Sequence, residues 1–180
     1  MKANWMALAL VAAIAGTASA ADEAKKTDAE RLAESLKLWE KAKKESNGNY
    51  SYTVRWSSAF GFGHVTTVKV EGNKVTERTF APIEWPMPGE KPEEPKAKWT
   101  ETGKDIGSHK DEGVPAKTVD DLYIEAKKIL EEKLPENERL VLGFDKAGLL
   151  SYCFTIDTRI ADDAPAKGVK AFVLKLEAKK

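Results

Sequence analysis

Hydrophobic residues recur every three or four positions in two segments of the chain, which is the spacing of one face of an α-helix. The first segment follows Thr27 and places Leu32, Leu36 and Trp39 on one face. The second segment follows Thr118, and its apolar positions are Val119, Leu122, Ala126, Ile129 and Leu130. Threonine is a favourable residue at a helix N-cap. We therefore predict one helix after each of these two threonines.

Alternating apolar and polar residues, typical of half-buried β-strands, follow the first predicted helix. The three strands predicted there are residues 50–57, 65–70 and 75–80. Gly72-Asn73, a dipeptide typical of tight hairpins, separates the last two. The first strand places Tyr50, Tyr52 and Trp56 on one face, and we interpret this face as core beneath the first helix.

The pattern of one helix followed by three strands returns in the second half of the chain. The strands predicted there are residues 139–144, 149–158 and 168–177. Short connections between consecutive strands favour antiparallel pairing. We therefore predict an α+β fold of tandem helix–three-strand units, with two helices on one face of an antiparallel sheet of about six strands.

A proline-rich segment, residues 81–117, separates the two units. Prolines 82, 86, 88, 92 and 95 lie there, and proline disfavours both helices and central strands because it lacks an N–H donor. We predict an extended loop over residues 81–117. The first unit then comprises residues 27–80 and the second comprises residues 118–178.

The first 20 residues have the organisation of a secretory signal peptide. Lys2 precedes an apolar run from Trp5 to Ala15, and Ala18-Ser19-Ala20 supplies the small residues preferred at a cleavage site. The alternative, a membrane anchor, requires about 20 apolar residues to cross a bilayer, more than this run contains. We predict that residues 1–20 are removed and that residues 21–180 form a single periplasmic or secreted domain without a membrane span.

The charge balance and the cysteine count argue against several classes of protein. Lys and Arg total 29 and Asp and Glu total 29, so the formal net charge is zero. A balanced chain lacks the positive field that attracts nucleic acid, and we expect no nucleic-acid partner. The lone cysteine, Cys153, has no partner for an intrachain disulfide. Its apolar neighbours predict a buried, unreactive thiol.

The sequence contains no familiar motif for catalysis or cofactor binding. G-x-S-x-G, a phosphate-binding glycine loop and H-E-x-x-H are all absent, and we expect no cofactor. The only histidines are His64 and His109, which lack the spacing of a shared metal site. We interpret both as solvated loop residues in the first instance.

An acidic cluster offers one candidate for metal binding. Asp157, Asp162 and Asp163 lie around a turn, and carboxylate oxygens are the ligands that calcium prefers. Their spacing does not match an EF-hand loop. The alternative is a solvated turn in which aspartates cap backbone amides. We favour this alternative and predict no metal.

Aromatic residues near two loops are the candidate binding residues. Phe60, Phe62 and His64 surround the turn between the first two strands, and Trp85 and Trp99 lie in the proline-rich segment. Exposed aromatic side chains anchor many binding sites because each buries a large area on contact. We predict a recognition surface formed by these five residues, with core packing as the alternative for the turn.

Several short motifs occur in order along most of the mature chain. They are Trp39, Asn49-Tyr50-Ser51-Tyr52-Thr53, Gly72-Asn73-Lys74-Val75, Thr118-Val119-Asp120-Asp121-Leu122, Phe144-Asp145 with Gly148, and Asp162-Asp163. In this order they resemble a family of bacterial secreted proteins defined only as a domain of unknown function. The resemblance implies secretion and a helix-plus-sheet plan, and it implies no activity.

The chain departs from that family at two places. Family members often carry a cysteine pair where this chain has Trp56-Ser57-Ser58, and often a proline where it has Leu149-Leu150. The layout is also similar to PepSY-type domains and small periplasmic inhibitor domains, an analogy of architecture that says little about function.

Three functions are compatible with these observations. The first is a non-enzymatic binding or inhibitory domain whose partner is a periplasmic or extracellular protein or a small molecule. The second is a carrier of a small molecule or lipid, held in an apolar cavity between sheet and helices. The third is a hydrolase with an unrecognised site. We favour the first, because the scaffold is complete and no catalytic motif accompanies it.

Overall fold

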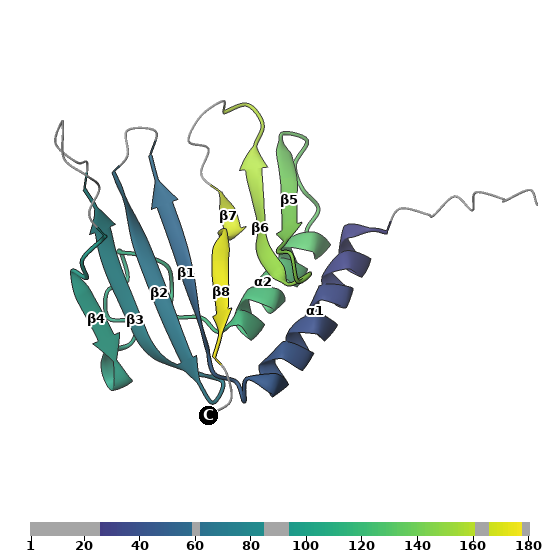
Figure 1. Cartoon of the computed structure of the whole chain (residues 1–180). Helices are drawn as coiled ribbons and strands as arrows, with labels where there is room; N and C mark the ends of the chain where they lie inside the picture. Colours follow the sequence, from purple (N-terminus) through teal and green to yellow (C-terminus); the bar gives the residue numbers. More distant parts are fainter. Residues whose placement is uncertain (1–25, 59–61, 85–93, 161–165, 178–180) are drawn as a thin grey trace, which may run out of the picture.

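The computed structural model describes residues 26–58, 62–84, 94–160 and 166–177. These residues form two α-helices, a five-stranded sheet and a three-stranded sheet (Figure 1). The elements are α1 (Asp28–Glu45), β1 (Tyr50–Ser57), β2 (Gly63–Glu71), β3 (Lys74–Ile83), β4 (Trp99–Thr102), the 3-10 turn η1 (Gly103–Asp105), α2 (Val119–Glu131), β5 (Glu138–Phe144), β6 (Leu150–Asp157), β7 (Lys167–Val169) and β8 (Phe172–Leu176). The paired strands are antiparallel, so the predicted α+β class is confirmed.

The two sheets meet at a break in the last predicted strand. The strand order is β4-β3-β2-β1-β8 in one sheet and β5-β6-β7 in the other. Only Lys170 and Ala171 separate β7 from β8, so the chain passes from one sheet to the other within two residues. The sequence predicted one strand over residues 168–177 and one sheet of about six strands. The structure differs in both respects.

The backbone around Gly168 shows why this strand is divided. Gly168 has a φ of 117°, which L side chains rarely adopt, and a Cβ there would stand 2.7 Å from the carbonyl oxygen of Cys153 on β6. Pairing with β6 ends at Val169, and Phe172 then pairs with Val54 on β1. Alternation in a sequence indicates which face a side chain occupies but not which strand it pairs with, so the sequence did not reveal this switch.

Both helices begin at the predicted N-caps. The Thr27 hydroxyl accepts a hydrogen bond from the Glu30 N–H at 3.2 Å, and the Glu30 carboxylate accepts one from the Thr27 N–H at 2.8 Å. Thr118 and Asp121 form the same reciprocal pair at the start of α2. Each pair satisfies two backbone donors at the start of its helix.

The core lies between the two helices and β1. The fully buried Trp39 of α1 packs edge-on against Tyr50, with ring centroids 4.9 Å apart. The Tyr50 hydroxyl accepts a hydrogen bond from the Val119 N–H of α2 at 3.1 Å, so one strand residue contacts both helices. Tyr50 and Tyr52 are buried as predicted, whereas Trp56 is 43% exposed and is not part of the core.

The second helix is joined to α1 and β6 through Tyr123. Its hydroxyl lies 2.7 Å from the Ser35 hydroxyl and accepts a hydrogen bond from the Leu150 N–H at 2.9 Å. Cys153 of β6 is completely buried against α2, as predicted, with its Sγ 3.8 Å from the Ala126 carbonyl oxygen. Burial raises the pKa of this thiol to about 11, so the thiol stays protonated near neutral pH.

The segment predicted as an extended loop, residues 81–117, contains regular structure. β3 continues to Ile83, and β4 pairs with it from Phe80↔Trp99 to Glu77↔Thr102. The turn η1 follows directly. Sequence patterns missed β4 because it is four residues long and stabilised by contacts with residues distant in the chain.

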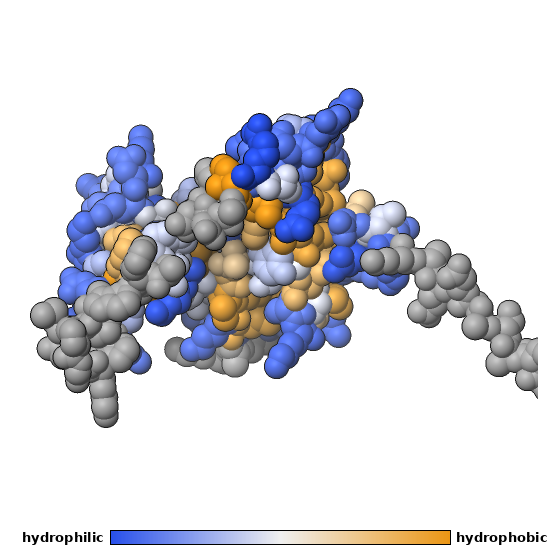
Figure 2. Space-filling model, turned by 90° about the horizontal axis from the view of Figure 1, so that it is seen from above, coloured by the Kyte–Doolittle hydropathy of each residue, from blue (hydrophilic) through white to orange (hydrophobic). Residues whose placement is uncertain are grey.

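The surface combines apolar and polar regions. Seen from above, hydrophobic residues gather in the middle of the molecule with hydrophilic residues around them (Figure 2). In the described part of the chain, neither helix combines the length and the apolar character needed to cross a bilayer. The predicted signal peptide, residues 1–20, lies outside the described residues.

Candidate functional site

Six aromatic and histidine rings form a continuous row across β1, β2, β3 and β4. In spatial order they are Phe62, Trp56, His64, Phe80, Trp99 and His109, and we call them the aromatic row. Successive ring centroids are 6.0, 5.6, 5.3, 5.4 and 4.3 Å apart. Trp56 is directly opposite His64, and Phe80 is opposite Trp99. Opposed residues of antiparallel strands leave the same face of the sheet, which brings these rings into contact.

The aromatic row unites three of the five predicted binding residues: Phe62, His64 and Trp99. Phe60 and Trp85 lie outside the described residues. Several ring faces in the row stack on one another and are therefore covered; the Trp99 and His109 rings are only 7° from parallel. At the end of the row opposite His109, two large apolar rings are exposed: Trp56 at 43% and Phe62 at 50%.

A buried ion pair lies beside the aromatic row. Arg78 donates from Nε and Nη2 to the two carboxylate oxygens of Glu101, each at 2.8 Å, and both side chains are at most 2% exposed. Glu101 also accepts hydrogen bonds from the backbone N–H groups of Gly107 and His109, at 2.7 and 2.6 Å. Burial alone would raise the pKa of Glu101, but the hydrogen bonds from Arg78, His109 and Gly107 outweigh it and hold the pKa well below its usual range.

The same ion pair fixes residues 106–117, which we call the covering segment. Arg78 donates to the carbonyl oxygens of His109 and Val114, at 2.7 and 2.9 Å. Gly113 has a φ of 75°, and a Cβ there would stand 2.6 Å from the Thr66 hydroxyl on β2. The covering segment therefore lies close against the sheet, in a conformation that favours glycine at this position.

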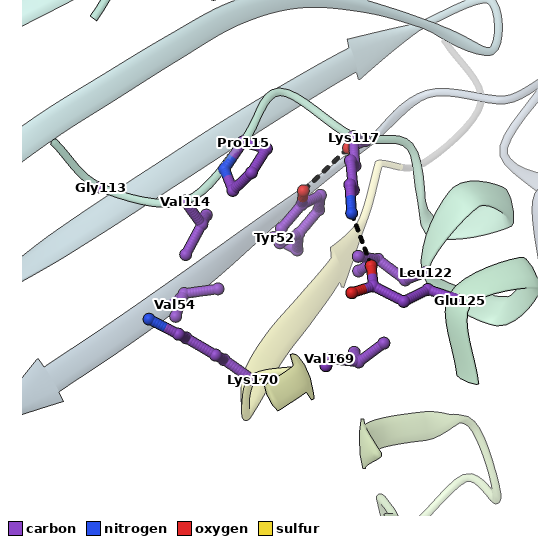
Figure 3. A pocket seen from close by; sticks show the side chains of 11 residues that line it. Tyr52, Val54, Gly113, Val114, Pro115, Lys117, Leu122, Glu125, Val169 and Lys170 are labelled. Atoms are coloured by element: carbon purple, nitrogen blue, oxygen red, sulfur yellow. Dashed lines mark hydrogen bonds and ion pairs between the residues drawn. The ribbon is translucent and has the colours of Figure 1, made fainter. Parts of the chain in front are cut away.

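A cleft of about 180 Å³ opens between the covering segment, β1, α2 and the junction of β7 with β8 (Figure 3). Its apolar walls are formed by Val54, Val114, Leu122 and Val169. Tyr52 contributes its ring, while its hydroxyl donates to the Lys117 carbonyl oxygen at 2.8 Å. Burial raises the pKa of Tyr52, so this hydroxyl remains a donor.

Three charged side chains line the cleft. The Lys117 ammonium lies 2.6 Å from a carboxylate oxygen of Glu125 on α2. Lys170 extends across the cleft toward Val54 (Figure 3). The ammonium of Lys170 makes no ion pair or hydrogen bond with any residue of the described ranges. Two lysines and one glutamate give the lining one net positive charge.

The lowered pKa of His64 leads to a prediction about how stability depends on pH. Burial, and then the nearby positive charge of Lys170, lower the pKa of His64 from 6.5. The unfolded chain therefore takes up this proton at higher pH than the folded chain does. We expect this group to reduce the free energy of unfolding as pH falls from 6.5 through the folded-state pKa. NMR titration of the imidazole gives that pKa directly.

The comparison variant for this prediction is His64→Phe, which keeps a ring in the aromatic row. Urea unfolding between about pH 8 and pH 5 spans the range in which histidine titrates. The variant should lose less stability than the wild type as the pH is lowered. An equal loss in both proteins, or a His64 pKa at or above 6.5, would contradict the proposed environment of this residue.

The acidic turn holds an internal ion pair at Asp157. Its carboxylate accepts hydrogen bonds from the Arg159 guanidinium at 2.6 and 3.0 Å. These bonds hold the pKa of Asp157 well below its usual range. Asp162 and Asp163 lie outside the described residues. Across the described ranges, no group of three or more potential metal-ligating side chains occurs.

The fold and the cleft together define an α+β protein with an apolar, partly charged cleft beside its central strand. No protein-family model, curated protein or solved structure matches the chain. The resemblance to secreted proteins of unknown function stays a prediction. Function is therefore inferred from the geometry of the cleft and its surroundings.

Proposed function

We propose that this protein is a non-enzymatic, periplasmic or secreted binding domain that holds a small molecule in the cleft between β1, α2 and the covering segment. The observation that carries this proposal is the cleft itself, with four aliphatic side chains as walls and three charged side chains around them. Binding sites for small molecules are typically concave and mostly apolar, with a few polar groups that set orientation.

The attachment of the covering segment supports this proposal. Arg78 and Glu101 bond this segment through the backbone of Gly107, His109 and Val114. Val114 also contributes its side chain to the cleft. The wall is thus held in place before any ligand arrives, and a pre-formed site loses less conformational freedom on binding.

The chemistry of the lining favours binding over hydrolysis. The residues around the cleft include no serine, cysteine or histidine, the usual sources of a nucleophile and its base. The Glu125 carboxylate is engaged by Lys117, and the Tyr52 hydroxyl donates to a backbone carbonyl. These interactions occupy the polar groups best placed to act on a bound molecule.

The test is a ¹³C-methyl NMR titration with a panel of single-ring and short-chain compounds of each charge. We expect at least one compound to shift the methyl signals of Val54, Val114, Leu122 and Val169 together. Val54→Phe places a ring in the cleft and should weaken that binding at least about tenfold, which is about 1.4 kcal/mol. Val173→Phe makes the same change at a residue that is 75% exposed on β8, outside the cleft lining, and should bind as the wild type does.

Two results would overturn the proposal. One is a panel in which no compound shifts the cleft methyl groups. The other is a Val54→Phe variant that binds the compound as tightly as the wild type does and unfolds at close to the wild-type temperature. Binding lost in Trp56→Ala but retained in Val54→Phe would instead assign recognition to the exposed end of the aromatic row, where Trp56 and Phe62 are in contact.

A further inference from the structure

We infer that the ligand of this cleft is a small monoanion with an apolar body about the size of one benzene ring, and that Lys170 pairs with its anionic group. This inference rests on the proposed function and adds the chemical class of the ligand. Three features of the cleft carry it: its volume, the apolar character of its walls and the uneven charge of its lining.

The volume limits the body of the ligand. The cleft measures about 180 Å³, whereas pockets for drug-sized molecules measure roughly 300–1,000 Å³. An apolar cavity of about 150 Å³ holds benzene. A single ring or a short branched chain therefore fills the space, and a lipid with long acyl chains does not fit within it.

The walls select an apolar body. Val54 and Val114 contribute aliphatic side chains on one side, and Leu122 and Val169 on the other (Figure 3). The Tyr52 hydroxyl is committed to the Lys117 carbonyl oxygen, so Tyr52 offers mainly its ring. A ligand with polar groups along its body would lose hydrogen bonds to water without replacement, which costs roughly 1–3 kcal/mol per group.

The lining charges select an anion. Lys117 and Glu125 neutralise each other at 2.6 Å, so this pair attracts neither sign strongly. Lys170 spans the cleft toward Val54 (Figure 3), and its ammonium has no partner among the described residues. One unpaired ammonium balances one negative charge, and a carboxylate beside it gains a charge-assisted hydrogen bond.

His64 lies close enough to Lys170 for its pKa to respond to the charge there. Burial is the larger cause of the lowered pKa of His64, and the positive charge of Lys170 adds to it. A carboxylate bound to Lys170 would offset that charge and raise the His64 pKa. The imidazole of His64 thus reports on the ligand without being part of the cleft lining.

The experiment titrates the full chain with four probes of similar size: benzoate, hexanoate, benzyl alcohol and benzylamine. Methyl shifts of Val54 and Val169 measure binding, and the His64 imidazole signals measure its pKa. We expect benzoate or hexanoate to bind at least tenfold more tightly than benzyl alcohol, and benzylamine to bind most weakly. The preference should diminish at high salt, because Lys170 is exposed.

Two lysine variants isolate the contribution of Lys170. Lys170→Gln should weaken carboxylate binding about tenfold and leave benzyl alcohol binding unchanged. Lys175→Gln removes the same charge from β8, at an exposed residue outside the cleft lining, and should bind all four probes as the wild type does. A raised His64 pKa with bound carboxylate, absent in Lys170→Gln, would support the pairing independently.

The outcomes separate this inference from the proposed function. If benzyl alcohol binds as tightly as the carboxylates, or if Lys170→Gln binds them normally, the anionic ligand is overturned. If Val54→Phe nevertheless loses binding of these probes, the cleft remains the binding site. If none of the four probes binds, the inference is also overturned. The wider compound panel then tests the proposed function by itself.

Discussion

The Glu101→Gln variant is expected to lose about 3–5 kcal/mol of unfolding free energy, the usual cost of breaking a buried ion pair. The substitution keeps the size of the side chain but leaves the Arg78 guanidinium buried without its counter-charge. It also turns an amide N–H₂ toward donors, because Arg78, Gly107 and His109 all donate to this carboxylate. Urea unfolding followed by circular dichroism measures the loss.

A second measurement ties this loss to the covering segment. The amide protons of Gly107 and His109 should exchange with solvent much faster in Glu101→Gln, because their acceptor is weakened. Glu112→Gln is the matched control on the same segment: the Glu112 side chain is 35% exposed and bonds Lys98 and Trp99. It should cost no more than about 1 kcal/mol. Equal losses in the two variants would show that burial of Glu101 contributes little.

Removing both charges at once refines this prediction. An Arg78→Met/Glu101→Leu double variant eliminates the pair without leaving a lone buried charge. Such replacements are often close to neutral, so the double variant should be more stable than Glu101→Gln. It should still show a loosened covering segment, since Arg78 no longer donates to the Val114 and His109 carbonyl oxygens.

The Trp39→Ala variant is expected to lose about 3–5 kcal/mol, the range for truncating a buried large aromatic side chain. Trp39 is 0% exposed and packs edge-on against Tyr50. Its indole N–H also donates to Asp120 at the start of α2, at 3.2 Å. The substitution leaves a cavity where α1, α2 and β1 meet, and urea unfolding measures the cost.

Trp56→Ala is the matched control for this cavity. The same side chain is removed, but Trp56 is 43% exposed at the end of β1. Trp56 contacts two rings, Phe62 and His64, and one such contact contributes about 1 kcal/mol. The loss should therefore be about 1–2 kcal/mol, and the denaturant dependence should be unchanged. If Trp56→Ala were as costly as Trp39→Ala, the aromatic row would have to be regarded as a second core.

Local features of the fold were predictable from the sequence, and pairing between distant strands was not. Both helix starts follow from a threonine and an acidic residue three positions later. The partner of β8, by contrast, is β1, which lies next to it in the sheet but near the other end of the domain in the sequence. No local pattern records this choice, because it depends on how the whole sheet closes over the helices.

The surroundings of the cleft divide in the same way, although Phe62, His64 and Trp99 do not line the cleft itself. Phe62, His64 and Trp99 were predicted from residue type alone, and strand register brings them into one row. Arg78 and Glu101 were missed, because charged residues within an alternating pattern usually face solvent. They are buried only because β4 joins β3 and the covering segment closes over both. The available signal was the position of Arg78 two residues before Phe80, which places both side chains on the same face of β3.

The pairing of β1 with β8 also affects the timing of folding. Tyr50 is opposite Leu176, so the five-stranded sheet remains incomplete until nearly the entire domain has been synthesised. Contacts between such distant residues slow folding, since a long loop must close before they form. We therefore expect the pairing of β1 with β8, which completes the five-stranded sheet, to be a slow and late step in folding.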